Sequence, residues 1–452
     1  MKSFPAGGLL LEASMVRFLS LLLVGVAVAS CSRATGTGPA TLPYGAIGAS
    51  ATRSSQASEL ATYTQIHSFS PPPDGNSPSS DVIHNSDNGR FYGTTYGGGA
   101  TPPSGPCAQG CGTVYSIDPS GSKPEKVVYA FKGDMNGAIP QGGLTNPVNG
   151  VIYGTTSNGG HKDAANCPQG CGTVFKIDSS DGESVAYRFK GGTQDGSNPV
   201  GGVRNANGVL FGTTEYGGTG GYGTVFELTA SGERVLYSFS GRPEGAYPVG
   251  NLSFLNGVLY GVTRAGGTYN VGTIFKLLPT SGAVTKIHNF KSAEGDSPVG
   301  LESVPPLNML YGAASTAGAF ERGTVFAMTP DGSIKWIYSF KNVKGDGSSP
   351  LARPIFYKNA LYGTTDGGGV GGNGTIYKIG NVASGKDECV LHSFGKLPQG
   401  VRPDAPLRQW NNLLYGTTVL GGSGYHDEGL GTVFKISPAS CPSTSRSARF
   451  NR

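Results

Sequence analysis

The sequence lacks the features that define several classes of protein. Glycine accounts for 75 of 452 residues, yet it does not recur at every third position, which excludes a collagen triple helix. Aromatic residues are not scarce, at 10%, and the net charge is only +5, so the composition is not that of a disordered chain. The basic excess lies before residue 61 and after residue 441, and the segment between is close to neutral. No nucleic-acid partner is therefore expected.

A long apolar run is also absent. Residues 18–28, FLSLLLVGVAV, form a run that is too short to cross a bilayer, which takes about 20 helical residues. Its length and the preceding Arg17 are typical of the apolar core of a signal peptide. A buried core helix is the alternative, but the run has no polar face. We expect residues 1–30 to be a signal peptide.

The end of this run predicts an anchor. Val28-Ala29-Ser30-Cys31 resembles a bacterial lipobox, which implies that Cys31 carries lipid after cleavage. Residues 31–61 are rich in Ala, Ser, Thr and Gly without an apolar period, as expected of a flexible tether. The protein is thus expected at the cell envelope, periplasmic or on the cell surface, with the lipid as its only contact with a membrane.

A short word, Tyr-Gly-Thr-Thr or a near variant, recurs seven times, 49–61 residues apart. It starts at Tyr92, Tyr153, Phe211, Tyr260, Tyr311, Tyr362 and Tyr415. A strand like Gly-Thr-Val-Phe follows each copy, from Gly112, Gly172, Gly223, Gly272, Gly323, Gly374 and Gly431. A third segment, like VLYSF, ends at Phe69, Phe131, Phe189, Phe239, Phe290, Phe340 and Phe394. The fourth begins at Pro78, Pro140, Pro199, Pro248, Pro298, Pro350 and Pro403.

Four strand-like segments in seven copies predict an all-β fold, a seven-bladed β-propeller over residues 62–441. A four-stranded unit cannot bury both faces alone, so the copies must stack, and closing the ring removes the exposed ends. The last copy lacks its Phe-ending strand, so the segment at residues 63–69 is expected to complete that blade and close the ring. A β-helix is the alternative, but its turns are much shorter. Residues 442–452 are expected to be a disordered tail, and the protein a monomer.

The recurring word is interpreted as a folding device. Its aromatic residue is expected to fill space between blades, and its Gly to let a ring or backbone approach closely. The Pro-led strand should lie nearest the axis, where small residues such as Gly201, Gly202 and Gly250 fit.

The joint pattern LYGTT, GG, GTVFKI and LYSF resembles the GloVer-type tandem repeat of exported bacterial proteins, over about residues 62–437. The resemblance implies a surface or periplasmic repeat protein without an established activity. The fifth copy departs most, because YGAAS at residues 311–315 replaces the threonines. That departure argues against a chemical role for the threonines of the word.

Six cysteines are expected to form disulfides in an exported chain. Cys107 and Cys111 occupy a loop that matches the loop of Cys167 and Cys171 in the next copy. Local bridges are predicted within each pair, with a zinc site built from all four as the alternative. A third bridge is predicted between Cys389 and Cys441, the other two.

No catalytic or metal-binding group is predicted. His67, His288 and His392 lie at matching positions beside the recurring Phe, which favours packing. Acids that precede the Pro-led strand stand beside or near glycine and are interpreted as turn residues, with calcium binding as the alternative: Asp74, Asp134, Asp195, Asp296 and Asp346. No Ser/His/Asp group or metal-spaced histidines can be assembled, so neither catalysis nor a cofactor is expected.

The function predicted is that of a binding or scaffolding module, with a polysaccharide or envelope protein as partner. The face that gathers the Gly-rich loops should also present aromatic side chains as a contact surface: Tyr96, Tyr216, Tyr222, Tyr269, Phe320 and Tyr425. The alternative for these rings is packing over the loops. The alternative function is an enzyme acting on glycans or lactones at the mouth of the ring.

Overall fold

The computed structural model describes residues 61–441 apart from 100–106, 108–109, 164, 342, 424–428 and 439–440. Residues 57–452 belong to one compact unit. The predicted signal peptide, Cys31, nearly all of the tether and the tail lie outside the described residues, as does Tyr425. Among the described residues, no helix is long and apolar enough to cross a membrane.

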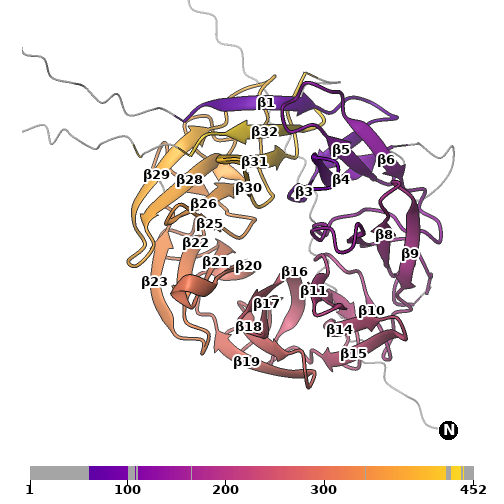
Figure 1. Ribbon diagram of the computed structural model, residues 1–452. Coiled ribbons are helices and arrows are strands. Elements are labelled where there is room, and N and C mark those ends of the chain that lie inside the picture. Colours follow the sequence, from indigo (N-terminus) through magenta and orange to yellow (C-terminus); the bar gives the residue numbers. More distant parts are fainter. Residues whose placement is uncertain are drawn as a thin grey trace, which may run out of the picture. The chain divides into compact units, whose positions relative to one another are not determined.

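The described chain is a seven-bladed β-propeller, which confirms the predicted fold class (Figure 1). Each blade is an antiparallel meander that runs outward from the central axis. The innermost strands are β2 (Gly75–Pro78) with β3 (Ile83–Asn85), β11 (Arg204–Ala206), β16 (Ala246–Leu255), β20 (Asp296–Val304), β25 (Ile355–Tyr357) and β30 (Arg408–Trp410). The second strands, which hold the recurring word, are β4 (Arg90–Gly98), β7 (Ile152–Thr156), β12 (Val209–Thr214), β17 (Val258–Ala265), β21 (Met309–Thr316), β26 (Ala360–Thr365) and β31 (Leu413–Thr418).

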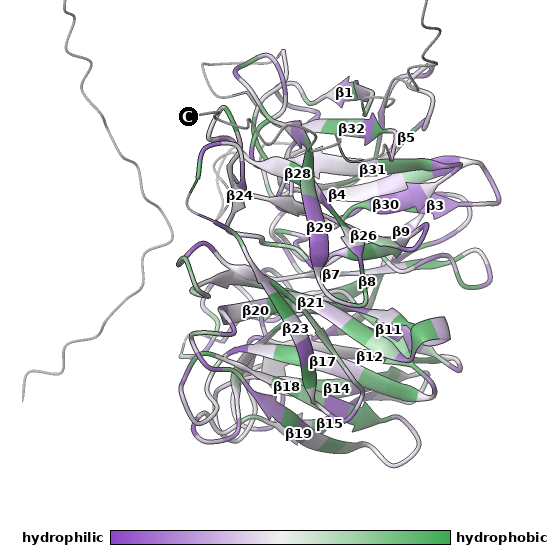
Figure 2. Cartoon of the chain, turned by 90° about the vertical axis from the view of Figure 1, so that its left-hand side faces the viewer, coloured by the Kyte–Doolittle hydropathy of each residue, from purple (hydrophilic) through white to green (hydrophobic). Residues whose placement is uncertain are grey.

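The two outer positions follow the predicted order. The third strands are β5 (Thr113–Ile117), β8 (Thr173–Ile177), β14 (Thr224–Thr229), β18 (Thr273–Leu278), β22 (Thr324–Met328), β28 (Thr375–Asn381) and β32 (Thr432–Ile436). The outermost strands are β6 (Lys126–Ala130), β9 (Glu183–Arg188), β15 (Gly232–Ser238), β19 (Ala283–Asn289), β23 (Ile334–Ser339), β29 (Lys386–Ser393) and β1 (Tyr63–Ser68). Seen from the side, outer strands such as β23 carry both hydrophilic and hydrophobic residues (Figure 2), and only one of the six residues of β23 is exposed, because its apolar side chains pack against two cores between blades.

Local departures from the regular meander are few. In the second blade the segment that starts at Pro140 forms no inner strand, although Thr145 N–H donates to the Tyr153 carbonyl at 2.8 Å. Two short ribbons pair across the loops, β10 (Gly196–Ser197) with β13 (Tyr216–Gly217) and β24 (Gly347–Ser348) with β27 (Gly367–Gly368). A 3₁₀ turn, η1 (Pro305–Leu307), lengthens the inner hairpin of the fifth blade.

Aromatic rings join each blade to the next. The recurring Phe at the end of every outer strand contacts the Phe or Tyr of the next Gly-Thr-Val-Phe strand, with ring centroids 5.1–5.6 Å apart. That second ring lies across the Gly of the word in its own blade. A Cβ on Gly212, for example, would lie 2.5 Å from the Phe226 ring. The prediction that this Gly admits a close ring is confirmed.

The word's aromatic residue and its threonines are structural. The aromatic side chains are almost wholly buried in six of the seven copies, as in Tyr92 and Tyr415. The second Thr shares a hydrogen bond of 2.7–2.9 Å with the Thr of the third strand in six blades, as Thr214 does with Thr224. The fifth blade has Ala314 instead, and there Thr324 donates to the Glu294 carbonyl.

A Gly–Pro contact joins consecutive blades near the loops. The Gly that opens each third strand has a positive φ, and a Cβ there would lie 2.5 or 2.6 Å from the Cδ of the next recurring Pro. The residue before each Pro is left-handed as well, and its N–H donates to the residue before that Gly, as Tyr247 donates to the Tyr222 carbonyl. Tight packing at this contact therefore holds the blades in register.

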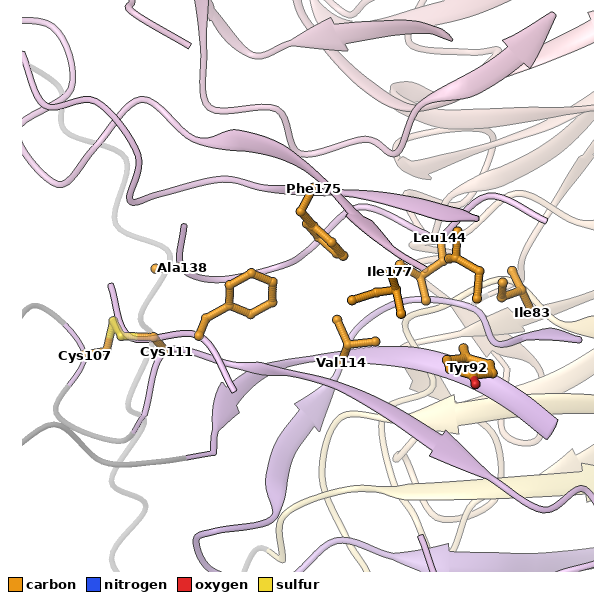
Figure 3. Close-up of a cluster of buried hydrophobic side chains, with 11 residues drawn as sticks. Ile83, Tyr92, Cys107, Cys111, Val114, Ala138, Leu144, Phe175 and Ile177 are labelled. Atoms are coloured by element: carbon orange, nitrogen blue, oxygen red, sulfur yellow. A yellow bond between two sulfur atoms is a disulfide. The ribbon is translucent and has the colours of Figure 1, made fainter. Parts of the chain in front are cut away.

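The three disulfides join the predicted partners: Cys107 with Cys111, Cys167 with Cys171, and Cys389 with Cys441. The first two lie in the loops between second and third strands. The cluster in Figure 3 extends from the Cys107–Cys111 bridge to Tyr92 and Ile83 nearer the axis. Each short bridge therefore caps one end of a core between blades.

Candidate functional site: the central cavity

A cavity of about 770 Å³ lies on the propeller axis, among the inner segments of all seven blades. The ring of inner strands in Figure 1 surrounds it. Its volume falls in the usual range for small-molecule sites, about 300–1,000 Å³. The cavity is therefore large enough for a ligand of several sugar rings or a comparable molecule.

One register position of the repeat supplies a residue to the cavity wall from every blade. This residue lies opposite the aromatic residue of the recurring word, as Arg204 lies opposite Phe211 and Ser253 opposite Tyr260. The seven residues at this position are Ile83, Thr145, Arg204, Ser253, Glu302, Ile355 and Arg408. The residue opposite it on the second strand is always Tyr or Phe. The wall residue itself differs between blades and includes Ile, Arg and Glu.

A second position that lines the cavity also differs from blade to blade. Asp81, Asn251 and Arg353 line the cavity three residues after their recurring Pro, where the second and third blades have Gly143 and Gly202. A Cβ on Gly143 would lie 2.7 Å from Asp81 Oδ1 and 3.0 Å from Asn251 Nδ2. The glycines therefore leave room for the longer polar side chains of other blades.

The wall carries charge of both signs. Arg353 forms an ion pair with Glu302, and Arg408 Nη2 donates to Asn146 Oδ1 at 2.5 Å. Burial lowers the pKa of the Arg204 guanidinium, and the positive charges of Arg353 and Arg408 lower it further, whereas Glu302 opposes that shift. Three arginines therefore lie close enough to affect one another.

Asp81 is the most buried acid of the wall. Its side chain is 7% exposed, and no other described residue donates a hydrogen bond to its carboxylate. Burial raises its pKa, while Arg353 and Arg408 oppose that shift. A ligand hydroxyl in the cavity could supply the missing donor.

Sequence reasoning missed this wall. The predicted proximity of the Pro-led strand to the axis is confirmed, with Gly201 and Gly250 packed against the backbone of the next inner segment. The wall residues were not singled out, because no two of them form a motif along the chain. An alignment of the seven copies would have shown them, because one position of the inner strand varies while the aromatic residue paired with it on the second strand does not.

The loop face has the aromatic residues that the sequence predicts. Tyr96, Tyr216, Tyr222, Tyr269 and Phe320 are all exposed, at 38–53%, in or beside loops that join second and third strands. Tyr216 and Tyr222 contact Tyr247, with centroids 5.5 and 5.7 Å apart. Two of the five, both in the third blade, thus group around Tyr247. The other three, Tyr96, Tyr269 and Phe320, belong to the first, fourth and fifth blades.

The histidines and acids act in packing and turns. His67, His288 and His392 each meet the recurring Phe edge to face, at 4.7–5.0 Å. Turn aspartates accept nearby backbone N–H groups, as Asp195 does from Lys190 and Gly196. Both roles agree with the sequence-based interpretation.

One group could hold a cation. His67, Asp74 and Glu125 place one ligand atom each within 4.8 Å of one another between the last and first blades. The corresponding position between other blades has a pair of carboxyl groups and a tyrosine in place of the histidine. These pairs are Asp195 with Glu233, beside Tyr187, and Asp346 with Glu388, beside Tyr338. The arrangement therefore recurs as part of the packing between blades, where burial and the neighbouring aspartate raise the pKa of each glutamate.

These carboxyl pairs predict that stability falls as pH rises. Burial, with a nearby aspartate, raises the pKa of Glu125 to about 8 and those of Glu233 and Glu388 to about 7. The folded protein holds these protons above the unfolded value of about 4.5, so their stabilisation is complete below that pH and is lost as pH rises toward 8. The thermal midpoint should fall between pH 5 and pH 9.

A glutamine in place of the first acid tests the cause. Glu125→Gln should flatten the fall in midpoint, whereas Glu321→Gln, at an exposed loop position, should leave it unchanged. An identical pH profile in all three proteins would show that the buried pair does not hold a proton.

Comparison with known proteins agrees with the fold. The extracellular domain of a hybrid two-component system from B. thetaiotaomicron matches 85% of this chain and 43% of its own, at 13% identity and a TM-score of 0.52. A GH74 xyloglucanase from Xanthomonas campestris matches 79% of this chain and 52% of its own, at 11% identity and a TM-score of 0.52. This chain thus spans about half the length of each, and such identities show the fold alone. No curated protein matches in sequence.

The family follows from the repeat itself. The model of the Gloeobacter/Verrucomicrobia repeat matches residues 163–355 and 302–451, more than half of the chain. The copies it recognises are blades of the propeller described above. This chain belongs to the Gloeobacter/Verrucomicrobia repeat family.

Proposed function

We propose that this protein is a binding module of the cell envelope that holds its ligand in the central cavity. The varied register position carries the proposal. Packing residues recur almost unchanged around the ring, so folding explains them, but folding does not require Arg, Glu, Ser and Thr at one wall position. Selection for a ligand explains why that position differs from blade to blade.

The compartment supports this function. The three disulfides indicate an oxidising, extracytoplasmic environment. A signal peptide at residues 1–30 and a lipid on Cys31 would export the protein and keep it at the envelope. Cys31→Ser should then move the protein from the membrane fraction to the soluble fraction, and unchanged membrane association would rule out the anchor.

The wall favours binding over catalysis. Its described residues include no His, Cys or Tyr, and Glu302 is paired with Arg353. The hydroxyls of Ser253 and Ser303 donate to the backbone carbonyls of Leu301 and Phe254. Neither serine therefore has a base beside it, as a nucleophile would need.

A blocked cavity tests the proposal. The full-length protein is screened against envelope glycans and small metabolites, and each ligand found is titrated into Gln409→Trp. Gln409 lines the cavity and is exposed, so the larger ring should fill space without disturbing the core. Affinity should fall at least tenfold, whereas Val370→Trp, on an exposed loop, should bind normally.

The loop face is the other location to test. If the ligand binds Gln409→Trp normally but not the triple substitution of Tyr222, Tyr269 and Tyr425 by Ala, the aromatic loops are the site. That result would contradict the cavity proposal and retain a binding function. Absence of binding by any probe to the unaltered protein would contradict both.

A further inference from the structure

We propose that the cavity binds a sugar acid, through the guanidinium of Arg204 and the carboxylate of Asp81. This inference rests on the proposed function and adds the chemical class of the ligand. Of the three arginines in the wall, Arg353 is paired with Glu302 and Arg408 donates to Asn146. Arg204 has no hydrogen bond or ion pair with any described residue, although it lines the cavity.

An unpaired guanidinium in this setting favours an anion. The positive charges of Arg353 and Arg408 repel the Arg204 guanidinium, while Glu302, which is paired with Arg353, attracts it. A bound carboxylate would reduce that repulsion and could accept two parallel N–H bonds from the planar fork of Arg204. Among the described residues of the wall there are two acids, Asp81 and Glu302, against three arginines, and Glu302 is paired with Arg353.

Asp81 indicates that the ligand also carries a hydroxyl. Its carboxylate is nearly buried and accepts no hydrogen bond from another described side chain or backbone group. Because the side chain lines the cavity, its oxygens can still accept a hydrogen bond from there, and a ligand O–H would supply one. An oxyanion without hydroxyls, such as sulfate, would offer no hydrogen bond to Asp81 and would place like charge beside it.

The remaining wall fits a sugar ring. Thr145, Asn205 and Gln409 offer amide and hydroxyl groups to ring hydroxyls, and Phe254 and Phe356 offer apolar surface to the C–H face of a sugar. An apolar acid, such as a fatty acid, would make no use of the donors that remain on these side chains, since Thr145 and Asn205 only accept backbone N–H groups within the protein. The wall thus selects a ligand that is both hydroxylated and anionic.

Two probes that differ only in charge provide the test. Tetragalacturonate and its methyl ester are titrated into the full-length protein by calorimetry. The acid should bind at least tenfold more tightly than the ester, and more weakly as salt rises. Arg204→Ala should reduce the affinity for the acid at least tenfold without lowering the thermal midpoint, because Arg204 has no hydrogen bond or ion pair with a described residue to lose.

A matched control separates the site from net charge. Arg234→Ala removes the same charge from the same blade, on an outer strand where Arg234 pairs with Glu227, and should leave affinity unchanged. Equal binding of acid and ester, no effect of Arg204→Ala, or inorganic sulfate binding as tightly as the acid would each overturn the inference.

The two proposals fail in different ways. A neutral ligand that Gln409→Trp excludes and Arg204→Ala does not affect would overturn the sugar acid and keep the cavity. Binding of the acid that survives Gln409→Trp would overturn the cavity, and with it this inference.

Discussion

Deleting residues 62–70 is expected to unfold the propeller or cause it to aggregate at ordinary temperature. These residues contain β1, which pairs antiparallel with β32 and forms the outer strand of the last blade. Phe69 is fully buried against Tyr115 of the first blade, and Tyr63 stacks on His392 of the sixth. Losing one buried Phe costs about 3–5 kcal/mol, a large part of a typical total of 5–15.

A second deletion is the control. Residues 32–58 are predicted to be tether and lie outside the described residues, so removing them should leave the thermal midpoint unchanged. Circular dichroism melts and size-exclusion chromatography of the two deletion proteins provide the comparison. Equal tolerance of both deletions would show that the first strand does not hold the ring together.

A smaller change keeps the prediction measurable if the first deletion yields no folded protein. Phe69→Leu keeps an apolar side chain but removes the edge-to-face contact with Tyr115. Aromatic pairs contribute about 0.5–1.5 kcal/mol beyond buried area, so a modest loss in urea melts is expected. A midpoint equal to that of the unaltered protein would contradict the role given to this contact.

The fold could be predicted from the sequence because its physical requirements recur. Each blade needs a Gly beneath a ring, a Phe at the end of its outer strand and a Pro against the Gly of the preceding blade. Seven copies make those needs visible in a single chain. The disulfides were predictable for a similar reason, since Cys107 and Cys111 occupy the same loop position as Cys167 and Cys171.

The candidate site could not be predicted in the same way. Arg204, Glu302 and Arg408 come from different blades, and only ring closure brings them to one cavity. The repeat also obscures them, because a reader who looks for what recurs passes over the position that does not. The exposed aromatic loops were predictable because local glycine content indicates a loop, but exposure alone does not show what a ring contacts.

Replacing Gly223 by Ala is expected to cost about twice as much stability as replacing Gly208. Both glycines have a left-handed backbone, with φ of +98° and +85°, so both substitutions bear a backbone cost of about 1–2 kcal/mol. A Cβ on Gly208 would meet nothing within 4 Å. On Gly223 it would lie 2.3 Å from the Thr214 carbonyl oxygen and 2.6 Å from Pro248 Cδ.

The excess cost measures the contact between blades. Neither the Thr214 backbone nor the Pro248 ring can rotate away, so the third and fourth blades must separate or the Gly223 strand must shift. Overpacking of this kind adds about 1–3 kcal/mol, which should place Gly223→Ala about 2–5 kcal/mol below the unaltered protein in urea melts. Equal losses for the two variants would mean that backbone conformation alone requires the glycine. An excess confined to Gly223→Ala would instead identify the Gly–Pro contact as a main reason why the repeat keeps both residues.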